Sequence, residues 1–180
     1  MVWKPNVTVA AVVERDGKYL LVEEETAGGL AFNQPAGHLE EGESLVDAVV
    51  RETLEETAYH FRPTHLVGVY NWTRPDGEVT YLRFAFAGEL RGWEAERKLD
   101  AGIVAARWLT LDEVRATQDR HRSPLILRCI EDLAAMLRPG ARGPLAQFGE
   151  ARQVIARVFR EISAAEKGHL VRRQKHGQRP

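Results

Sequence analysis

The sequence contains very little cysteine, with Cys129 the only one among 180 residues. A single cysteine excludes an internal disulfide, so the chain is not a disulfide-stabilised secreted scaffold. No apolar run is long enough to span a bilayer, and the N-terminus lacks the layout of a signal peptide. We therefore expect a cytoplasmic protein with no membrane partner, in which Cys129 is a small buried apolar residue.

The chain also lacks a large excess of charge of one sign, because its formal net charge is −1. The charges are unevenly spread. Residues 150–180 hold eight basic and three acidic residues, whereas the rest of the chain holds 17 basic and 23 acidic residues. The acidic part favours a cation, and the basic part could pack on the domain, contact a partner or be solvated. It lacks the interleaved aromatic residues that single-strand binding uses, so nucleic acid is an unfavoured partner.

One domain over residues 1–145 accounts for most of the chain, followed by a basic helical extension over residues 146–180. The length and the 44% content of hydrophobic residues fit one folded domain with a real core. Apolar residues at helical spacing predict an amphipathic helix over 149–166, with a frayed end from Gly168 onward. The pattern leaves monomer and homodimer open.

Segments with strand and helix patterns are mixed along the rest of the chain. We expect Pro63 to interrupt the backbone before one strand, and residues 91–100 to form a polar loop. Strands are predicted over 7–13, 19–23, 66–72, 79–88 and 103–109, with hairpin turns at 15–18 and 74–78, and helices over 45–57, from 111 and over 125–137. Thr110 predicts a capping box for the second helix, and Ser123 and Pro124 predict the cap and first turn of the third. Such a mixture indicates an α/β fold, with a mixed β-sheet sandwiched between α-helices.

An acidic segment next to a glycine-containing turn carries the chemistry. It reads Gly37-His38-Leu39-Glu40-Glu41-Gly42-Glu43, then seven residues, then Arg51-Glu52-Thr53-Leu54-Glu55-Glu56. On a helix, Glu52, Glu55 and Glu56 share one face, where like charges repel. Such a face is often simply solvated, but clustered carboxylates are also the ligands that Mg²⁺ takes in proteins. The glycine turn and the helix cap expected at Ser44 favour the metal site.

This spacing resembles the Nudix box, the sequence motif of the Nudix hydrolases. Every charged position of the motif is present. The family usually has a glycine where this chain has Ala58, and that glycine ends the helix in a left-handed conformation, which costs alanine ~1 kcal/mol. The difference affects the local turn rather than the chemistry.

The resemblance implies a Nudix fold and Mg²⁺-dependent hydrolysis of phosphoanhydrides, with Mn²⁺ as a substitute cation. By the family pattern the catalytic residues are Arg51, Glu52, Glu55 and Glu56, and the metal ligands are Glu52, Glu55, Glu56, Glu43 and the carbonyl of Gly37. Arg51 should hold Glu52 through an ion pair. The general base moves between members of the family and stays unassigned, and Asp100 is a candidate for an additional carboxylate.

A broader resemblance, from about Lys4 to about Leu145, is to a branch of bacterial phosphatases within the family. It is carried by the segments 4–10, 33–40, 82–86 and 122–125. It implies small-molecule substrates: nucleoside di- and triphosphates, hydroxymethylpyrimidine pyrophosphate and thiamine pyrophosphate, with release of orthophosphate. The alternatives are a nucleotide-sugar or RNA 5′-end pyrophosphohydrolase and a non-catalytic nucleotide-binding module.

Residues outside the motif are candidates for substrate binding. Arg83, on a strand facing a cleft, could clamp phosphate through its guanidinium group, and Arg74 is a second cation in a turn. Tyr70 and Trp72 could stack on a base or pyrimidine ring, as could Tyr81. His38 could bond phosphate or donate a proton, although a histidine in such a turn more often satisfies backbone groups.

Overall fold

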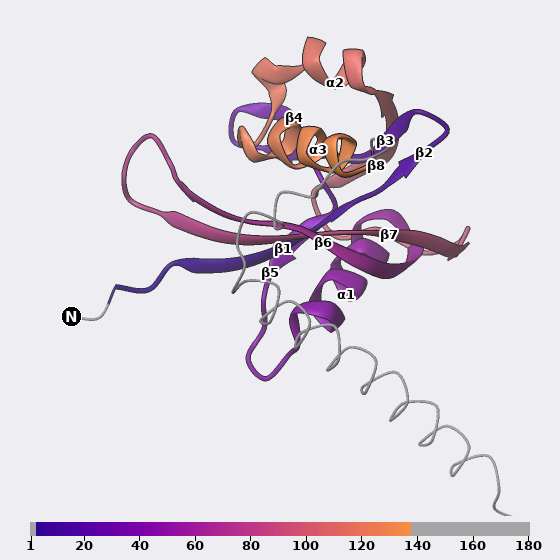
Figure 1. The fold of residues 1–180 in the computed structure, drawn as a ribbon, viewed down its shortest axis with the longest axis horizontal. Coiled ribbons are helices and arrows are strands. Elements are labelled where there is room, and N and C mark those ends of the chain that lie inside the picture. Colours follow the sequence, from indigo (N-terminus) through magenta and orange to yellow (C-terminus); the bar gives the residue numbers. More distant parts are fainter. Residues whose placement is uncertain (1–2, 138–180) are drawn as a thin grey trace, which may run out of the picture. The chain divides into compact units, whose positions relative to one another are not determined.

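The computed structural model describes residues 3–137, which contain eight strands, two α-helices of twelve or more residues and two shorter helices (Figure 1). The strands are β1 (Asn6–Val12), β2 (Glu14–Arg15), β3 (Lys18–Thr26), β4 (Gly29–Asn33), β5 (Ala36–His38), β6 (Tyr59–Thr73), β7 (Thr80–Trp93) and β8 (Ile103–Thr110). The helices are α1 (Leu45–Thr57), α2 (Leu111–Ala116), the 3₁₀ turn η1 (Gln118–Arg120) and α3 (Leu125–Met136). The helix expected over 149–166 and the extension over 146–180 lie outside the described residues. Within residues 3–137, no helix is both long and apolar enough to cross a membrane.

The strands form two four-stranded sheets rather than the single expected sheet. In the first sheet the order is β5-β1-β7-β6, with β1 and β7 parallel and the other pairs antiparallel. The second sheet joins β2, β3 and β4, and β8 pairs with β3. Helices α1 and α3 lie on opposite sides of the first sheet (Figure 1). The expected α/β architecture with helices on both faces is therefore confirmed.

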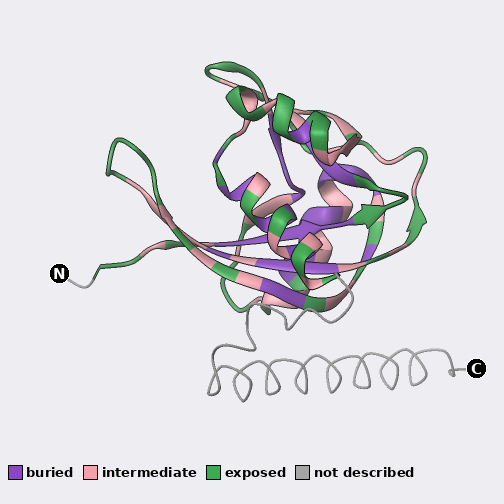
Figure 2. Ribbon diagram, turned by 45° about the horizontal axis from the view of Figure 1, so that its top comes forward, coloured by how far each residue is buried: buried purple, intermediate pink, exposed green. Residues whose placement is uncertain are grey.

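The main hydrophobic core cluster lies between the first sheet, the second sheet and α3. Helix α3 contributes one apolar face at helical spacing, and Cys129 on that face is fully buried, as expected. Burial raises the pKa of its thiol to about 11. Figure 2 shows the buried residues concentrated on the strands and on the inward faces of the helices. The buried residues of this cluster are Val12, Tyr19, Leu21, Phe32, Val67, Ala85, Ala87, Val114, Leu125, Ile126, Cys129, Ile130 and Leu133.

Local sequence signals set the bounds of α1. The Ser44 side chain accepts a hydrogen bond from Asp47 N–H and caps the N-terminus. At the other end Ala58 has φ 60°, and its N–H donates to Leu54 O. The left-handed turn expected at this position is therefore present, with alanine in place of the usual glycine. These two caps set the bounds of the helix that carries Glu52, Glu55 and Glu56.

Two long strands differ from the expectation. Strand β6 runs through Pro63 instead of starting after it, and β7 continues to Trp93, into the expected polar loop. Pro63 is tolerated because β6 is an edge strand of the first sheet, and the pairing with β7 shifts register on either side of it. The start of α3 also differs, because no side chain caps it and the Ser123 hydroxyl has no hydrogen-bond partner.

Candidate active site

Helix α1 presents its glutamates to the short strand β5. Gly37 lies against the carboxylate of Glu52 so closely that a Cβ atom at position 37 would overlap it. Any side chain at position 37 would therefore displace the Glu52 carboxylate, so the reason for glycine here is close approach rather than an unusual φ. Glu52 and Glu56 are each only 9% exposed, although both are acidic. The turn before the helix and the helix face thus enclose the acids that the sequence singled out.

Arg51 connects the acidic residues of this motif. Its guanidinium donates to both carboxylate oxygens of Glu43, through Nε and Nη2, each at 2.9 Å. Its Nη1 atom lies 2.8 Å from Glu52 Oε1 and 3.0 Å from Glu55 Oε2, and Nη2 also donates to His38 O at 3.2 Å. The expected Arg51–Glu52 ion pair is present. Two parallel bonds to one carboxylate fix the plane of the guanidinium, so Arg51 orients several acids at once.

The acids of the motif differ in how well they are compensated. The Arg51 guanidinium lowers the pKa of Glu43, whereas burial raises the pKa of Glu52 despite its bonds to Arg51. Glu56 accepts one hydrogen bond from Ala36 N–H at 2.8 Å. Burial raises its pKa to about 8, and the negative charges of Glu52, Glu24 and Asp100 act in the same direction. Glu56 is therefore the acid with the greatest need of an added positive charge.

The chemistry of these side chains fits a hard divalent cation, which binds carboxylate oxygens. Within residues 3–137, no three His, Cys, Asp or Glu side chains are already arranged around one cation position. Arg51 instead pairs with Glu52 and Glu55. Asp100, the additional candidate, lies close to α1, since its N–H donates to Glu55 O at 3.1 Å. The fit of the residues to a metal thus rests on their donor atoms and on the uncompensated charge at Glu56.

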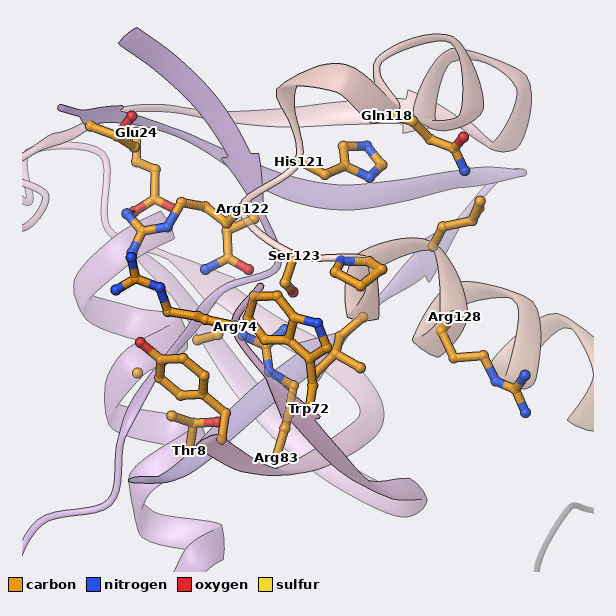
Figure 3. A pocket seen from close by; sticks show the side chains of 18 of the residues that line it. Thr8, Glu24, Trp72, Arg74, Arg83, Gln118, His121, Arg122, Ser123 and Arg128 are labelled. Carbon is orange, nitrogen blue, oxygen red and sulfur yellow. Dashed lines mark hydrogen bonds and ion pairs between the residues drawn. The ribbon is translucent and has the colours of Figure 1, made fainter. Parts of the chain in front are cut away.

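A cavity of about 1120 Å³ opens beside β5, lined from both sheets and from the segment before α3 (Figure 3). His38, Thr8, Arg83 and Tyr70 are consecutive partners across β5, β1, β7 and β6, so they belong to one row on the same face of the first sheet. The next row brings Trp72 opposite Tyr81, with their rings stacked 5.8 Å apart.

The structure brings four of the five predicted substrate-binding residues to this cavity. His38, Trp72, Arg74 and Arg83 line it, and Arg74 also pairs with Asp76 at 2.6 Å. Tyr70 does not line it: its side chain packs against the core, and its hydroxyl donates to Asp132 Oδ2 on α3 at 2.9 Å.

Arg83 is the most buried of these residues, at 8% exposure, and burial lowers the pKa of its guanidinium. Its Nη1 atom donates to Gln34 Oε1 at 3.1 Å, and Gln34 Nε2 in turn donates to Ile126 O on α3. Gln34 is fully buried, so the glutamine fixes one side of the guanidinium. The expectation that Arg83 faces a cleft is confirmed.

Several polar residues of the cavity wall were not among the sequence candidates: Thr8, Glu24, Asn33, Arg122 and Ser123. A polar residue within the apolar run over residues 7–12 was the available signal for Thr8. Asn33 and Ser123 fall inside segments that carried the family resemblance. Glu24 had no comparable signal, because it stands between two other glutamates and only the fold shows which of the three faces the cavity.

Comparison with known proteins agrees with this geometry. A family model described as the NUDIX domain matches residues 3–129. The chain is 40% identical over 151 residues to the phosphatase NudJ of Escherichia coli strain K12, a match that covers 82% of this chain and 93% of NudJ.

Solved structures show the same fold. A Nudix hydrolase from Nitrosomonas europaea is 55% identical, with a TM-score of 0.72 over 79% of this chain and 94% of that one. The Nudix domain of Shewanella oneidensis NrtR, solved in complex with ADP-ribose, has a TM-score of 0.63 at 22% identity, covering 76% of this chain and 91% of that one. At that identity the second likeness concerns the fold alone.

Proposed function

Because the chain belongs to the Nudix hydrolase family, we propose that it is a Mg²⁺-dependent phosphatase of nucleoside di- and triphosphates and of thiamine-related pyrophosphates. The family assignment confirms the resemblance drawn from the acidic motif, and with it the hydrolysis of phosphoanhydrides. The thiamine-related substrates in this proposal are hydroxymethylpyrimidine pyrophosphate and thiamine pyrophosphate. The observation that carries the proposal is the buried, uncompensated carboxylate of Glu56 beside a cavity with four arginines on its wall.

We propose that Glu52, Glu55, Glu56, Glu43 and the carbonyl of Gly37 hold the cation, with Mg²⁺ favoured and Mn²⁺ as a substitute. A bound divalent cation neutralises phosphate charge and lowers the pKa of an attacking water. The hard oxygen donors of this set support that choice. Their need for positive charge also supports it, because burial raises the pKa of both Glu52 and Glu56.

The remaining residues of the motif position these acids. Arg51 holds Glu43 through two bonds and reaches Glu52 and Glu55 with a third nitrogen. The N–H of Ala36 orients Glu56, and the absence of a side chain at Gly37 leaves room for Glu52. In this arrangement one sheet edge and one helix face are held at a fixed separation, which catalysis by positioned charges requires.

The cavity supplies the binding surface for the rest of the substrate. Its basic residues Arg74, Arg83, Arg122 and Arg128 outnumber its acids Glu24 and Glu131, which suits an anion. Arg83 is the proposed phosphate clamp, because Gln34 pre-orients its guanidinium. The stacked rings of Trp72 and Tyr81 offer a flat apolar surface for a base or pyrimidine.

Similarity to an E. coli phosphatase at 40% identity supports orthophosphate as the product. The nucleotide-sugar and RNA 5′-end alternatives have no specific support in the cavity. A non-catalytic module would not need Arg51 to hold Glu43, Glu52 and Glu55 in one network, with Glu56 fixed beside them by a backbone N–H.

The purified protein, incubated with Mg²⁺ and a panel of these substrates, tests the proposal through separate measurement of orthophosphate and pyrophosphate. We expect orthophosphate from several substrates. Glu55→Gln should lower the rate by orders of magnitude, while Glu41→Gln, an exposed position in the same motif, should not change it. Pyrophosphate from a single substrate would indicate a narrower pyrophosphohydrolase, and no turnover of any substrate would contradict catalysis.

A further inference from the structure

Buried polar atoms without a hydrogen-bond partner gather in the cavity. Within residues 3–137 there are six such side-chain atoms, and five of them belong to residues that line this cavity. They are Thr8 Oγ1, Glu24 Oε1, Asn33 Oδ1, Arg83 Nε and Ser123 Oγ. A buried polar atom that bonds to nothing costs about 1–3 kcal/mol, so such atoms are normally paired. Their concentration around one cavity points to a ligand that completes their hydrogen bonds.

The five atoms lie on two facing sides of the cavity. Thr8 and Arg83 are register partners on β1 and β7, in the floor of the first sheet. Glu24 comes from β3 and Asn33 from the end of β4, and Ser123 follows Arg122, whose N–H donates to Phe32 O. Figure 3 shows Glu24 and Arg122 at the opposite edge of the cavity from Thr8 and Arg83.

The unpaired atoms on the second-sheet side are acceptors or can act as acceptors. Glu24 bonds to Arg122 through Oε2 at 3.4 Å, which leaves Oε1 free. Asn33 Oδ1 is unpaired as well. A carboxylate oxygen and an amide oxygen accept hydrogen bonds and cannot donate them, while the Ser123 hydroxyl can do either. A ligand group that reaches this side must therefore carry N–H donors.

We propose that Glu24, Asn33 and Ser123 form a subsite for a nitrogen heteroaromatic ring that bears an exocyclic amino group. This inference rests on the proposed function and deepens it, because it specifies the organic part of the phosphoanhydride substrate. The amino group supplies two N–H donors for Glu24 Oε1 and Asn33 Oδ1. A carbonyl at the same ring position would instead place a third acceptor against these two oxygens.

The aromatic residues of the cavity are compatible with such a ring. Trp72 and Tyr81 stack on each other on the first-sheet side, within the same cavity as the polar subsite. The phosphates of the same ligand would extend toward Gly37 and the acids of α1, since Ala36, Gly37 and His38 line the cavity as well.

Cytosine and uracil nucleotides provide a matched pair of probes. Cytosine carries an amino group at position 4 and no proton on the neighbouring ring nitrogen, whereas uracil carries a carbonyl at position 4 and a proton on that nitrogen. The α,β-methylene analogues of CDP and UDP resist hydrolysis at that bridge, so calorimetric titration with Mg²⁺ measures binding without turnover. We expect the cytosine analogue to bind at least about tenfold more tightly. Equal affinities, tighter binding of the uracil analogue or no binding of either would overturn the subsite.

A single substitution then assigns the preference to the proposed residues. Glu24→Gln places an amide donor beside the ring and should bring the cytosine-to-uracil affinity ratio close to one. Glu25→Gln, at the exposed next position of the same strand, should leave the ratio unchanged. The ratio does not depend on the fraction of folded protein, so partial unfolding cannot imitate the result. An unchanged ratio in Glu24→Gln would overturn the assignment.

Hydrolysis of CTP and UTP, measured in parallel, separates the subsite from the proposed function. A preference in binding without turnover of either nucleotide would contradict the phosphatase and support the subsite. Turnover of both nucleotides at the same kcat/KM, with equal binding of the analogues, would contradict only the subsite. A large, equal loss of CTP and UTP hydrolysis in Glu24→Gln would place Glu24 in the catalytic centre instead and overturn its role in ring recognition.

Discussion

The buried carboxylate of Glu56 should make the metal-free protein less stable as the pH rises. Its pKa is about 8 in the folded state, against an ordinary value of 4.5. Between these values the unfolded chain releases the proton while the folded protein keeps it, so the free energy of unfolding falls as the pH increases. Below pH 4.5 both states are protonated, and above about pH 8 both are ionised, so the loss is complete. At ~1.4 kcal/mol per pKa unit, the loss reaches at most ~5 kcal/mol.

Glu56→Gln should remove this penalty, because the amide has no charge to bury and its oxygen can still accept the bond from Ala36 N–H. Urea unfolding in the presence of a chelator, at pH 5 and pH 9, measures the effect. We expect the variant to exceed the parent by ~2 to ~5 kcal/mol at pH 9, and by much less at pH 5. The same variant should lose Mg²⁺-dependent hydrolysis, so that it is more stable and inactive.

Two comparisons make the result specific to Glu56. Glu41→Gln removes an exposed carboxylate from the same motif and should follow the parent at both pH values. Mg²⁺ should stabilise the parent more than Glu56→Gln, because a ligand that binds only the folded state raises the free energy of unfolding. A parent and a Glu56→Gln variant with the same difference between pH 5 and pH 9 would refute the reasoning from buried charge.

Three further substitutions test the geometry of the motif. Gly37→Ala should lower kcat at least about tenfold with little change in Tm, because the new methyl group displaces the flexible end of Glu52 rather than the backbone. An unchanged kcat would contradict the close approach of Gly37 to Glu52. Arg51→Lys should lower kcat ~10- to ~100-fold, since an ammonium group cannot bind Glu43 through two parallel bonds, and parent-like kinetics would refute this. Ala58→Gly should change the free energy of unfolding by less than ~1 kcal/mol, because relief of the left-handed strain offsets loss of a buried methyl group; denaturant unfolding would expose a larger loss.

The sequence was most informative where the governing interactions are local. Ser44 and Ala58 mark the two ends of α1, and both act on backbone groups within four residues. The Thr110 capping box at the start of α2 is present for the same reason. The spacing of Glu52 and Glu56 follows from the period of the helix, so their common face could be predicted without knowledge of the fold.

Features that depend on long-range pairing could not be predicted in this way. The identity of β6 as an edge strand, which lets it continue through Pro63, appears only once the strand order is known. Tyr70 is two residues from Trp72 on the same face of β6, but the packing of α3 covers Tyr70 and leaves Trp72 in the cavity. Glu24 reaches the cavity only because β3 belongs to a second sheet, which the sequence pattern did not separate from the first.

The position of Pro63 has a consequence for how molecules of this protein meet in solution. Strand β6 is 15 residues long and borders the first sheet, so its outer backbone could act as a template for a strand of another molecule. Proline provides no N–H for such pairing, and the register shifts at 60/61, 63/65 and 66/68 bend the strand away from a regular ladder. The residues that made β6 hard to recognise in the sequence therefore discourage edge-to-edge aggregation.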